Sequence, residues 1–290
     1  MEQAVALTFS ALAMSAVLAL AATGFLVLYQ ASRVVNFAHG DIITCGGYVA
    51  LWAITTLHVP ALLGYLVAIV ALVVLGLVLE RVAYAPLRSR PHVVVLIATL
   101  AAALVLRAIL SLWQGNTPMR LPVLIPGFSI DVLGVTVNGQ RVVLIGVAAV
   151  VLAGIAFVLH RTGFGRRLRA VANDPQAAEL SGINTRRVSA IAWGISGGLA
   201  ALAGVLLAPL TVLSLTFGFT VMLGAFAAAV IGGFGSLRGV VVGALLVGFL
   251  GQFVGGYVFK DYASTLPFIA MLALLALRPS GLFATSTERL

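Results

Sequence analysis

The sequence predicts an all-α fold, a polytopic transmembrane helical bundle with about 8–10 membrane segments, some of them short or discontinuous helices. The chain is 62% hydrophobic and only 9% charged, and its mean hydropathy is +1.16. A soluble globular domain carries roughly 25% charged residues. The charged residues gather in short loops between apolar segments, so we expect residues 1–290 to form a single transmembrane domain.

Nine apolar segments approach the length of about 20 residues that a membrane helix needs. They cover residues 4–29, 42–57, 61–79, 93–112, 142–159, 189–213, 221–231, 240–258 and 263–277. The second and the seventh are short, and each adjoins a glycine-rich polar interruption. The number of membrane segments can therefore differ from nine by one or two.

The basic residues predict the orientation. Thirteen of the seventeen lie in one set of alternate loops, whereas the opposite set holds only Arg120, Arg141 and Lys260. The positive-inside rule assigns the basic set to the cytoplasm, with the N-terminus outside and the C-terminus inside. This distribution is typical of a protein of the lipid bilayer, and it excludes a nucleic-acid patch as the meaning of the +9 net charge. Cys45 is the only cysteine, so neither an intramolecular disulfide nor a Cys-based metal site is expected.

The outer loop, residues 113–140, contains three prolines and two segments in which apolar and polar residues alternate. Alternation of this kind is typical of short strands, so the loop is expected to hold a small hairpin across the outer mouth.

The cytoplasmic loop 161–188 carries six arginines and the signals of one short helix. Asp174 is suited to cap the amino end, and Pro175 to follow it where no N–H is needed. Gly182 can adopt the left-handed conformation that ends a helix, and Ile183 can fold back as its apolar contact. The sequence therefore predicts about two helical turns.

A helix this short cannot be stable alone, because helix nucleation is unfavourable. It is either a helix on the membrane surface or a knob that docks into another subunit. Ala177 and Ala178 lie in the middle of the helix, where small side chains permit close approach to a partner. The chain has no GxxxxGK[ST] motif and no central acidic residues of an ion-coupled carrier. A transporter of this kind would need energy from another protein, and a cytoplasmic knob is a place where that protein could act.

The first polar interruption contains Asn36, Phe37, His39 and Asp41. Polar groups and irregular backbone are costly near hydrocarbon unless they are buried in protein or line a cavity. One interpretation is a broken helix on a translocation path. The other is an ordinary cytoplasmic turn that Asp41 caps, and the residues alone do not decide between them.

The second interruption contains Gly232, Gly233, Gly235 and Ser236. Its spacing is not GxGxxG and no βαβ unit surrounds it, so a nucleotide site is excluded. No histidine is placed beside Ser236, which argues against an intramembrane serine protease. The glycine break could line a path, whereas the following small residues, Gly239 and Gly243, predict close helix packing.

Two charged residues stand within or beside apolar segments. Arg107 lies about one turn from the outer end of its segment, and we interpret it as snorkelling toward the membrane surface, with contact to a solute as the alternative. Glu80, at an inner boundary, is interpreted as interfacial rather than catalytic.

Four motifs together resemble the permease subunits of bacterial branched-chain amino acid ABC importers, most closely the first of the two paralogous permeases, the H type. They are Val-Asn-Phe-Ala-His-Gly-Asp at 35–41, the loop 169–184, Ile-Gly-Gly-Phe-Gly-Ser at 231–236 and Leu-Arg-Pro-Ser-Gly-Leu-Phe at 277–283. They span most of the chain in the family's order. The chain departs from the family where His39 and Asp41 stand, because Gln and Glu are common there.

The resemblance implies a non-enzymatic permease in the bacterial inner membrane, without a cofactor, that passes branched-chain amino acids by alternating access. Relatives carry urea, amides, aromatic acids or simple sugars, and a self-contained channel or facilitator is the alternative of another class. The implied partners are a second homologous permease, two cytoplasmic ATP-binding subunits and a periplasmic solute-binding protein. The resemblance also assigns ATPase coupling to Asp174, Pro175, Ala177, Ala178, Glu179, Leu180, Gly182 and Ile183.

Overall fold

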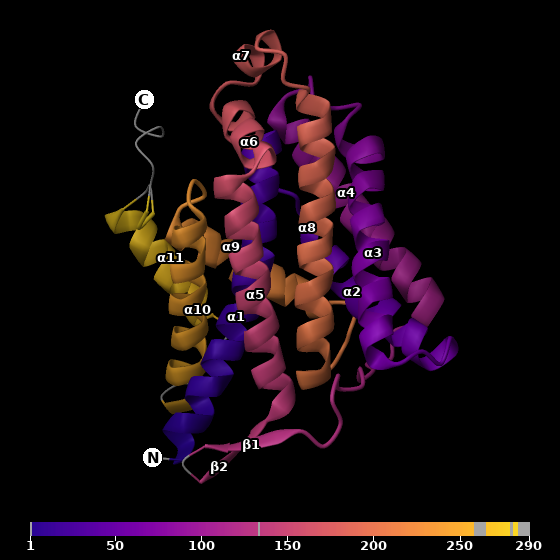
Figure 1. The fold of residues 1–290 in the computed structure, drawn as a ribbon, viewed down its shortest axis with the longest axis vertical. Helices are drawn as coiled ribbons and strands as arrows, with labels where there is room; N and C mark the ends of the chain where they lie inside the picture. Colours follow the sequence, from indigo (N-terminus) through magenta and orange to yellow (C-terminus); the bar gives the residue numbers. More distant parts are fainter. Residues whose placement is uncertain (1, 133, 258–264, 279–280, 284–290) are drawn as a thin grey trace.

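The apolar segments form a bundle of long helices that run close to one common axis in the computed structural model of the chain (Figure 1). The structure describes residues 2–132, 134–257, 265–278 and 281–283. Six of its helices, counted over those residues, are long and apolar enough to cross a membrane. The helices are α1 (Glu2–Ser32), α2 (His39–Thr56), α3 (Ala61–Leu79), α4 (His92–Gln114), α5 (Gly139–Arg161), α6 (Gly163–Asn173), α7 (Pro175–Leu180), α8 (Thr185–Leu207), α9 (Phe217–Gly232), α10 (Leu237–Tyr257) and α11 (Leu266–Leu277), with a π-helical turn Glu80–Tyr84 after α3 and a 3-10 turn Ala208–Leu210 after α8.

The predicted fold class is confirmed, and each of the nine apolar segments contributes a helix. The two that were expected to be short are α2, with 18 residues, and α9, with 16. Residues 258, 263 and 264, at the ends of two predicted segments, lie outside the described residues. Local hydrophobicity therefore located the membrane helices well, because each must present apolar side chains to lipid or to another helix.

The first helix, α1, is the central element of the bundle. It packs against α5, α8, α9 and α10, and Leu20 and Leu26 on it are fully buried. A helix that is apolar all round belongs in an interior. The peripheral helices instead expose large apolar side chains, such as Val70 on α3 and Val150 on α5, as expected for surfaces that face lipid tails.

The outer loop closes one end of the bundle, and the predicted hairpin is present. Strands β1 (Ser129–Val132) and β2 (Val135–Asn138) pair in antiparallel register, Ile130 opposite Val137. Asn138 caps α5 by accepting a hydrogen bond from the backbone N–H of Gln140 at 2.8 Å. The Gln140 side chain donates to the carbonyl of Leu206 near the carboxyl end of α8. These bonds hold the loop across the bundle end where the N-terminus also lies (Figure 1).

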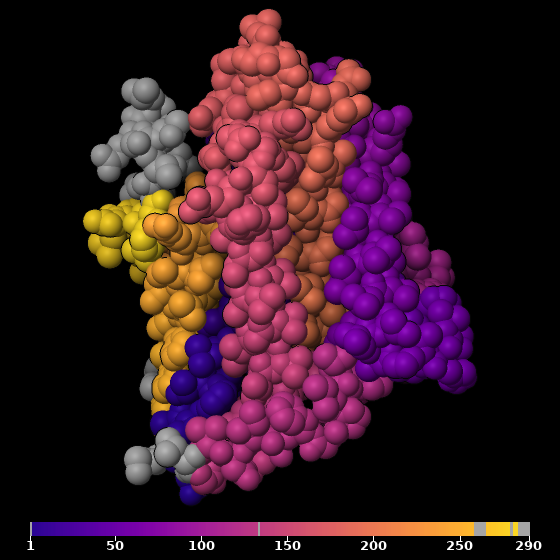
Figure 2. Space-filling view, viewed as in Figure 1, coloured from indigo at the N-terminus to yellow at the C-terminus, as the bar shows by residue number. Residues whose placement is uncertain are grey.

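The opposite end of the bundle carries the arginine-rich loop. The sequence predicted one helix there, and the structure has two: α6, which lies along the bundle, and α7, which projects beyond it (Figures 1 and 2). Helix α6 buries Leu168 and Val171 and packs Phe164 against the same core. These apolar residues recur at helical spacing, so the pattern was present among the arginines but was not recognised.

Candidate functional site

The first interruption is a break that lies inside the bundle. The chain leaves α1 at Ser32 and starts α2 only at His39. The side-chain oxygen of Asn36 accepts a hydrogen bond from the backbone N–H of Ala38 at 3.0 Å, and Phe37 donates its N–H to the Thr99 hydroxyl of α4 at 3.3 Å. Side chains therefore satisfy the backbone groups that a discontinuous helix leaves open, which is the condition for such a break at membrane depth.

His39 is fully buried between α1 and α8. One ring nitrogen lies 3.1 Å from the carbonyl oxygen of Ala21 and the other 3.3 Å from the Ser196 hydroxyl. The ring centroid lies 4.3 Å from that of Phe25. A neutral imidazole has one donor and one acceptor, and these two partners match that inventory. The contacts give His39 a packing role in this conformation, while its expected place on a path stays a prediction.

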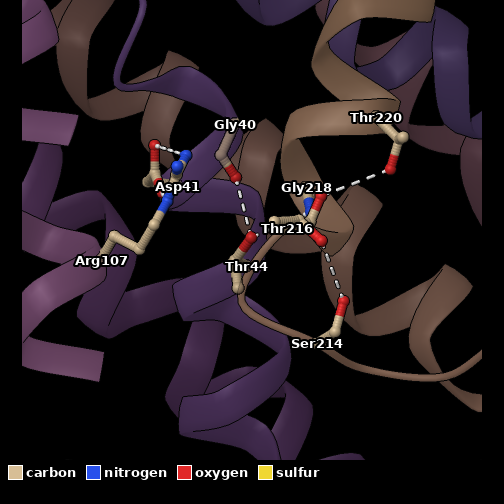
Figure 3. Close-up of polar contacts among 8 residues, drawn as sticks. All are labelled: Gly40, Asp41, Thr44, Arg107, Ser214, Thr216, Gly218 and Thr220. Carbon is tan, nitrogen blue, oxygen red and sulfur yellow. Dashed lines mark hydrogen bonds and ion pairs between the residues drawn. The ribbon is translucent and has the colours of Figure 1, made fainter. Parts of the chain in front are cut away.

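Asp41 and Arg107 form an ion pair between α2 and α4 (Figure 3). The Arg107 side chain donates from Nε to one carboxylate oxygen at 3.0 Å and from a terminal nitrogen to the other at 3.3 Å. The Asp41 side chain is 3% exposed and that of Arg107 33%. The interpretation of Arg107 as a snorkelling residue is wrong, because its charged group turns toward a buried partner on α2 rather than toward the membrane surface.

The amino end of α9 meets the amino end of α2 beside this ion pair. The Thr44 hydroxyl accepts a hydrogen bond from the N–H of Gly218 at 2.9 Å and donates to the carbonyl oxygen of Gly40 at 3.2 Å (Figure 3). A Cβ at Gly218 would overlap that carbonyl oxygen, so only glycine permits the contact. Two discontinuous helices thus start at one place, as they do where membrane transporters bind their solutes.

An exposed polar face surrounds this junction. Thr216 and Thr220 at the start of α9 are exposed, and Ser214 before it lies 3.4 Å from the Thr216 hydroxyl (Figure 3). The exposed ring of Phe219 has its centroid 5.9 Å from the Arg107 guanidinium carbon. Polar groups in a membrane segment normally face a partner helix or a water-filled space rather than lipid. We refer to Arg107, Ser214, Thr216, Phe219 and Thr220 as the α9 face.

A cavity of about 690 Å³ adjoins the α9 face. The hydroxyl residues Ser214, Thr216 and Thr220 line it together with apolar side chains, among them Leu18 and Val221. Mostly apolar walls with a few hydrogen-bonding groups are typical of pockets for small ligands. The arrangement suits a solute that has both an aliphatic part and polar groups.

The second interruption is a tight packing turn. Gly233 has φ +92°, which favours glycine. A Cβ at Gly232 would overlap the carbonyl oxygen of Gly239, and one at Gly243 would overlap that of Ala228. The predicted close packing of α10 is therefore confirmed. The backbone N–H of Leu282 also donates to the carbonyl oxygen of Ile231 at 2.9 Å. The described part of the C-terminal motif is therefore hydrogen-bonded to the end of α9.

Gly235 and Ser236 line a separate cavity at the α7 end of the bundle, away from the residues of the α9 face. Aromatic rings connect the two interruptions instead: Phe25 lies beside His39, Phe226 beside Phe25, and Phe234 beside Phe226. Packed side chains therefore link the two interruptions, and neither of these two cavities is lined by both. A path role for Gly232, Gly233, Gly235 and Ser236 stays a prediction.

The predicted helix caps of α7 are confirmed. The Asp174 carboxylate accepts from the N–H groups of Gln176 and Ala177 at 2.8 and 3.0 Å. At the other end Gly182 has φ +79°, and the N–H of Ile183 bonds the carbonyl oxygen of Ala178 at 3.0 Å. These bonds form the Schellman arrangement, which makes a helix of only 6 residues a defined knob.

The knob presents one face outward and packs the other on its own chain. Ala178 is 4% exposed, whereas Leu180 is 91% exposed and Ala177 is exposed beside it. The expectation that both alanines are open to a partner is therefore wrong for Ala178, which contacts this chain's own core. The Glu179 side chain accepts a hydrogen bond from Thr185 at the start of α8. Leu180 is therefore the exposed apolar side chain of α7, and the segment that holds α7 projects at the end of the molecule (Figure 2).

Known proteins match this chain along nearly its whole length. The family described as branched-chain amino acid transport system / permease component matches residues 7–275. The high-affinity branched-chain amino acid transport system permease protein BraD of Pseudomonas aeruginosa is 33% identical over 91% of this chain and 90% of its own length. The corresponding LivH of Escherichia coli is 30% identical over 94% and 93%.

Two more distant proteins are also similar to this chain. The ribose import permease protein RbsC of Escherichia coli is 29% identical over 83% of this chain and 75% of its own. Among solved structures, PsaBC from Streptococcus pneumoniae in complex with Fab has a TM-score of 0.50 at 14% identity, covering 97% of this chain and 92% of that one. At this identity the solved structure supports the fold alone.

Proposed function

Because the chain belongs to the permease-component family of branched-chain amino acid transport systems, we propose that it is one membrane subunit of a binding-protein-dependent ABC importer. In this proposal the chain passes a branched-chain amino acid into the cytoplasm by alternating access. ATP hydrolysis takes place on separate subunits, since the chain contains no GxxxxGK[ST] motif.

The observation that carries the coupling part of the proposal is the geometry of α7. A helix with both ends capped holds Leu180 outward at the tip, 91% exposed, on the end of the bundle that carries six arginines. An exposed apolar side chain on a rigid support is suited to enter a groove in a partner. We assign this role to the outward residues, Ala177 and Leu180, and assign the fixing of the knob to Asp174, Pro175, Ala178, Glu179, Gly182 and Ile183.

The proposed solute rests on the chemistry of the α9 face and its cavity. The apolar walls suit an aliphatic side chain, and the hydroxyls of Thr216 and Thr220 suit the polar end of an amino acid. Two of the Arg107 nitrogens bond Asp41, and its remaining donors can meet a carboxylate. The names of BraD and LivH support branched-chain amino acids as the solute.

The proposed assembly contains a second homologous permease, two cytoplasmic ATP-binding subunits and a periplasmic solute-binding protein. It lies in the bacterial inner membrane with α7 in the cytoplasm and the β1–β2 hairpin outside. The excess of arginine at the α7 end supports this orientation.

Gentle purification of the tagged chain from native membranes, followed by reconstitution, tests the proposal. We expect ATP-binding subunits and a second permease to co-purify. Uptake of radiolabelled leucine should require ATP at the α7 side and the cognate binding protein at the hairpin side. Equilibration of leucine through the chain alone would instead identify a facilitator, and ATP-dependent uptake of ribose but not leucine would overturn the proposed solute.

A further inference from the structure

A second cavity, of about 360 Å³, lies where α1, α5, α6 and the α9–α10 turn meet, at the α7 end of the bundle. Neither the α9 face nor the exposed tip of α7 contributes to it. Its walls combine apolar and polar side chains. The lining residues are Leu26, Gln30, Leu159, His160, Gly165, Arg169, Gly235, Ser236, Leu237 and Arg238.

The cavity brings together two arginines from elements far apart in the sequence. Arg169 comes from α6 and Arg238 from the first turn of α10, and none of the lining residues is acidic. Over the described residues the ion pair of Asp41 with Arg107 is the one salt bridge. Two guanidinium groups that share a cavity without a carboxylate leave a local excess of positive charge, which an anion would neutralise.

The backbone around the cavity strengthens this potential. Helix α5 ends here, and the side chains of Thr162 and Arg169 donate hydrogen bonds to two carbonyls of its last turn, at Val158 and Leu159. Helix α10 begins here, and Ser236 caps it by accepting from the N–H of Gly239 at 3.3 Å. Donors therefore cover part of the negative end of α5, and the positive end of α10 adds to the potential of the cavity.

We propose that this cavity binds the phosphate of an anionic phospholipid of the cytoplasmic leaflet. A guanidinium group can form two parallel hydrogen bonds with a phosphate, so Arg169 and Arg238 supply a matched pair of ligands. Leu26, Leu159 and Leu237 form the apolar part of the lining, which suits the glycerol region next to a headgroup. Basic pockets between helices at the cytoplasmic boundary are the usual sites for anionic headgroups. The proposal is independent of the transported solute.

Native mass spectrometry of the purified full-length chain, titrated with phosphatidylglycerol or phosphatidylcholine, tests the proposal. The Arg169→Gln/Arg238→Gln variant should bind phosphatidylglycerol roughly 10- to 30-fold more weakly than the wild type. Arg166 and Arg167 lie on the same α6 helix, are exposed like Arg169 and do not line the cavity, so Arg166→Gln/Arg167→Gln removes equal charge and supplies a matched control. This control should bind phosphatidylglycerol like the wild type.

Arg169 also caps α5, so the single variant Arg238→Gln is measured beside the double variant, and Arg238→Lys should retain most of the affinity. A further arm replaces the lipid with inorganic phosphate. Arginine-dependent binding of phosphatidylglycerol alone would identify the lipid as the source of the phosphate, and equal binding of inorganic phosphate would identify a free anion. Unchanged affinity for both ligands in Arg238→Gln and in the double variant would overturn the proposal.

Discussion

At the scale of single residues, the Asp41–Arg107 ion pair dominates the candidate site. Asp41 is almost fully buried, so its carboxylate needs the two hydrogen bonds that Arg107 donates. The same pair fixes the guanidinium beside Phe219 and the α9 face. A charged pair at this depth therefore has both a structural role, joining α2 to α4, and a position from which it can meet a solute.

The stability losses from removing the two partners of this pair should not add, because either single change already leaves the other charge without its partner. Asp41→Asn leaves the Arg107 charge without its acceptor, and we expect a loss of about 2 kcal/mol, below the value for fully buried pairs because Arg107 is partly exposed. The Asp41→Asn/Arg107→Gln double variant should be less destabilised than the sum of the single variants. Thermal unfolding in detergent measures this coupling, and strictly additive losses would contradict the pairing.

Single residues also show which features of the site could be predicted from the sequence and which could not. Asp174 and Gly182 were recognised because capping is a local property of the chain. The partner of Arg107 was not recognised, because Asp41 lies 66 residues away and the pairing depends on how α2 packs against α4. Ala178 looked equivalent to Ala177 in the sequence, yet the direction in which α7 leaves α6 turns one inward and the other outward.

At the scale of secondary-structure elements, the short helices α2 and α9 carry the function proposed here. Each starts inside the bundle, and the Thr44 hydroxyl ties the two starts together. The sequence predicted that both are short, since each apolar segment adjoins a polar, glycine-rich interruption. The sequence did not predict that the two helices start side by side, because no local pattern tells which broken helix lies beside which.

Gly232, at the end of α9, should tolerate no side chain. In Gly232→Ala the new Cβ would overlap the carbonyl oxygen of Gly239, and overpacking of this kind costs about 1–3 kcal/mol. Gly146→Ala in α5 is the matched control, because a Cβ there meets nothing within 4 Å. We expect a lower unfolding temperature and a lower yield of monodisperse protein for Gly232→Ala alone. Equal behaviour of the two variants would show that the close contact is not needed.

At the scale of the whole molecule, the two ends of the bundle differ in kind. The end with the N-terminus is closed by the β1–β2 hairpin, whereas the other end carries the arginine-rich loop, α6 and the projecting knob α7 (Figure 1). The charge asymmetry between the ends was visible in the sequence and predicts which end is cytoplasmic. In the proposed orientation, the solute enters at the hairpin end and passes the α9 face, and ATP hydrolysis acts on the α7 end.

The central claim is that α7 is a cytoplasmic knob on which an ATPase docks, and thiol accessibility tests it most directly. With Cys45→Ser as background, Leu180→Cys places a thiol at the exposed tip, and Thr117→Cys places one in the exposed outer loop. An impermeant maleimide should label Thr117→Cys in intact cells. It should label Leu180→Cys only in inside-out vesicles, and bound ATP-binding subunits should slow that reaction at least about tenfold, as expected for a side chain buried in an interface core. Labelling of Leu180→Cys in intact cells, or an unchanged rate when the subunits are bound, would contradict the account.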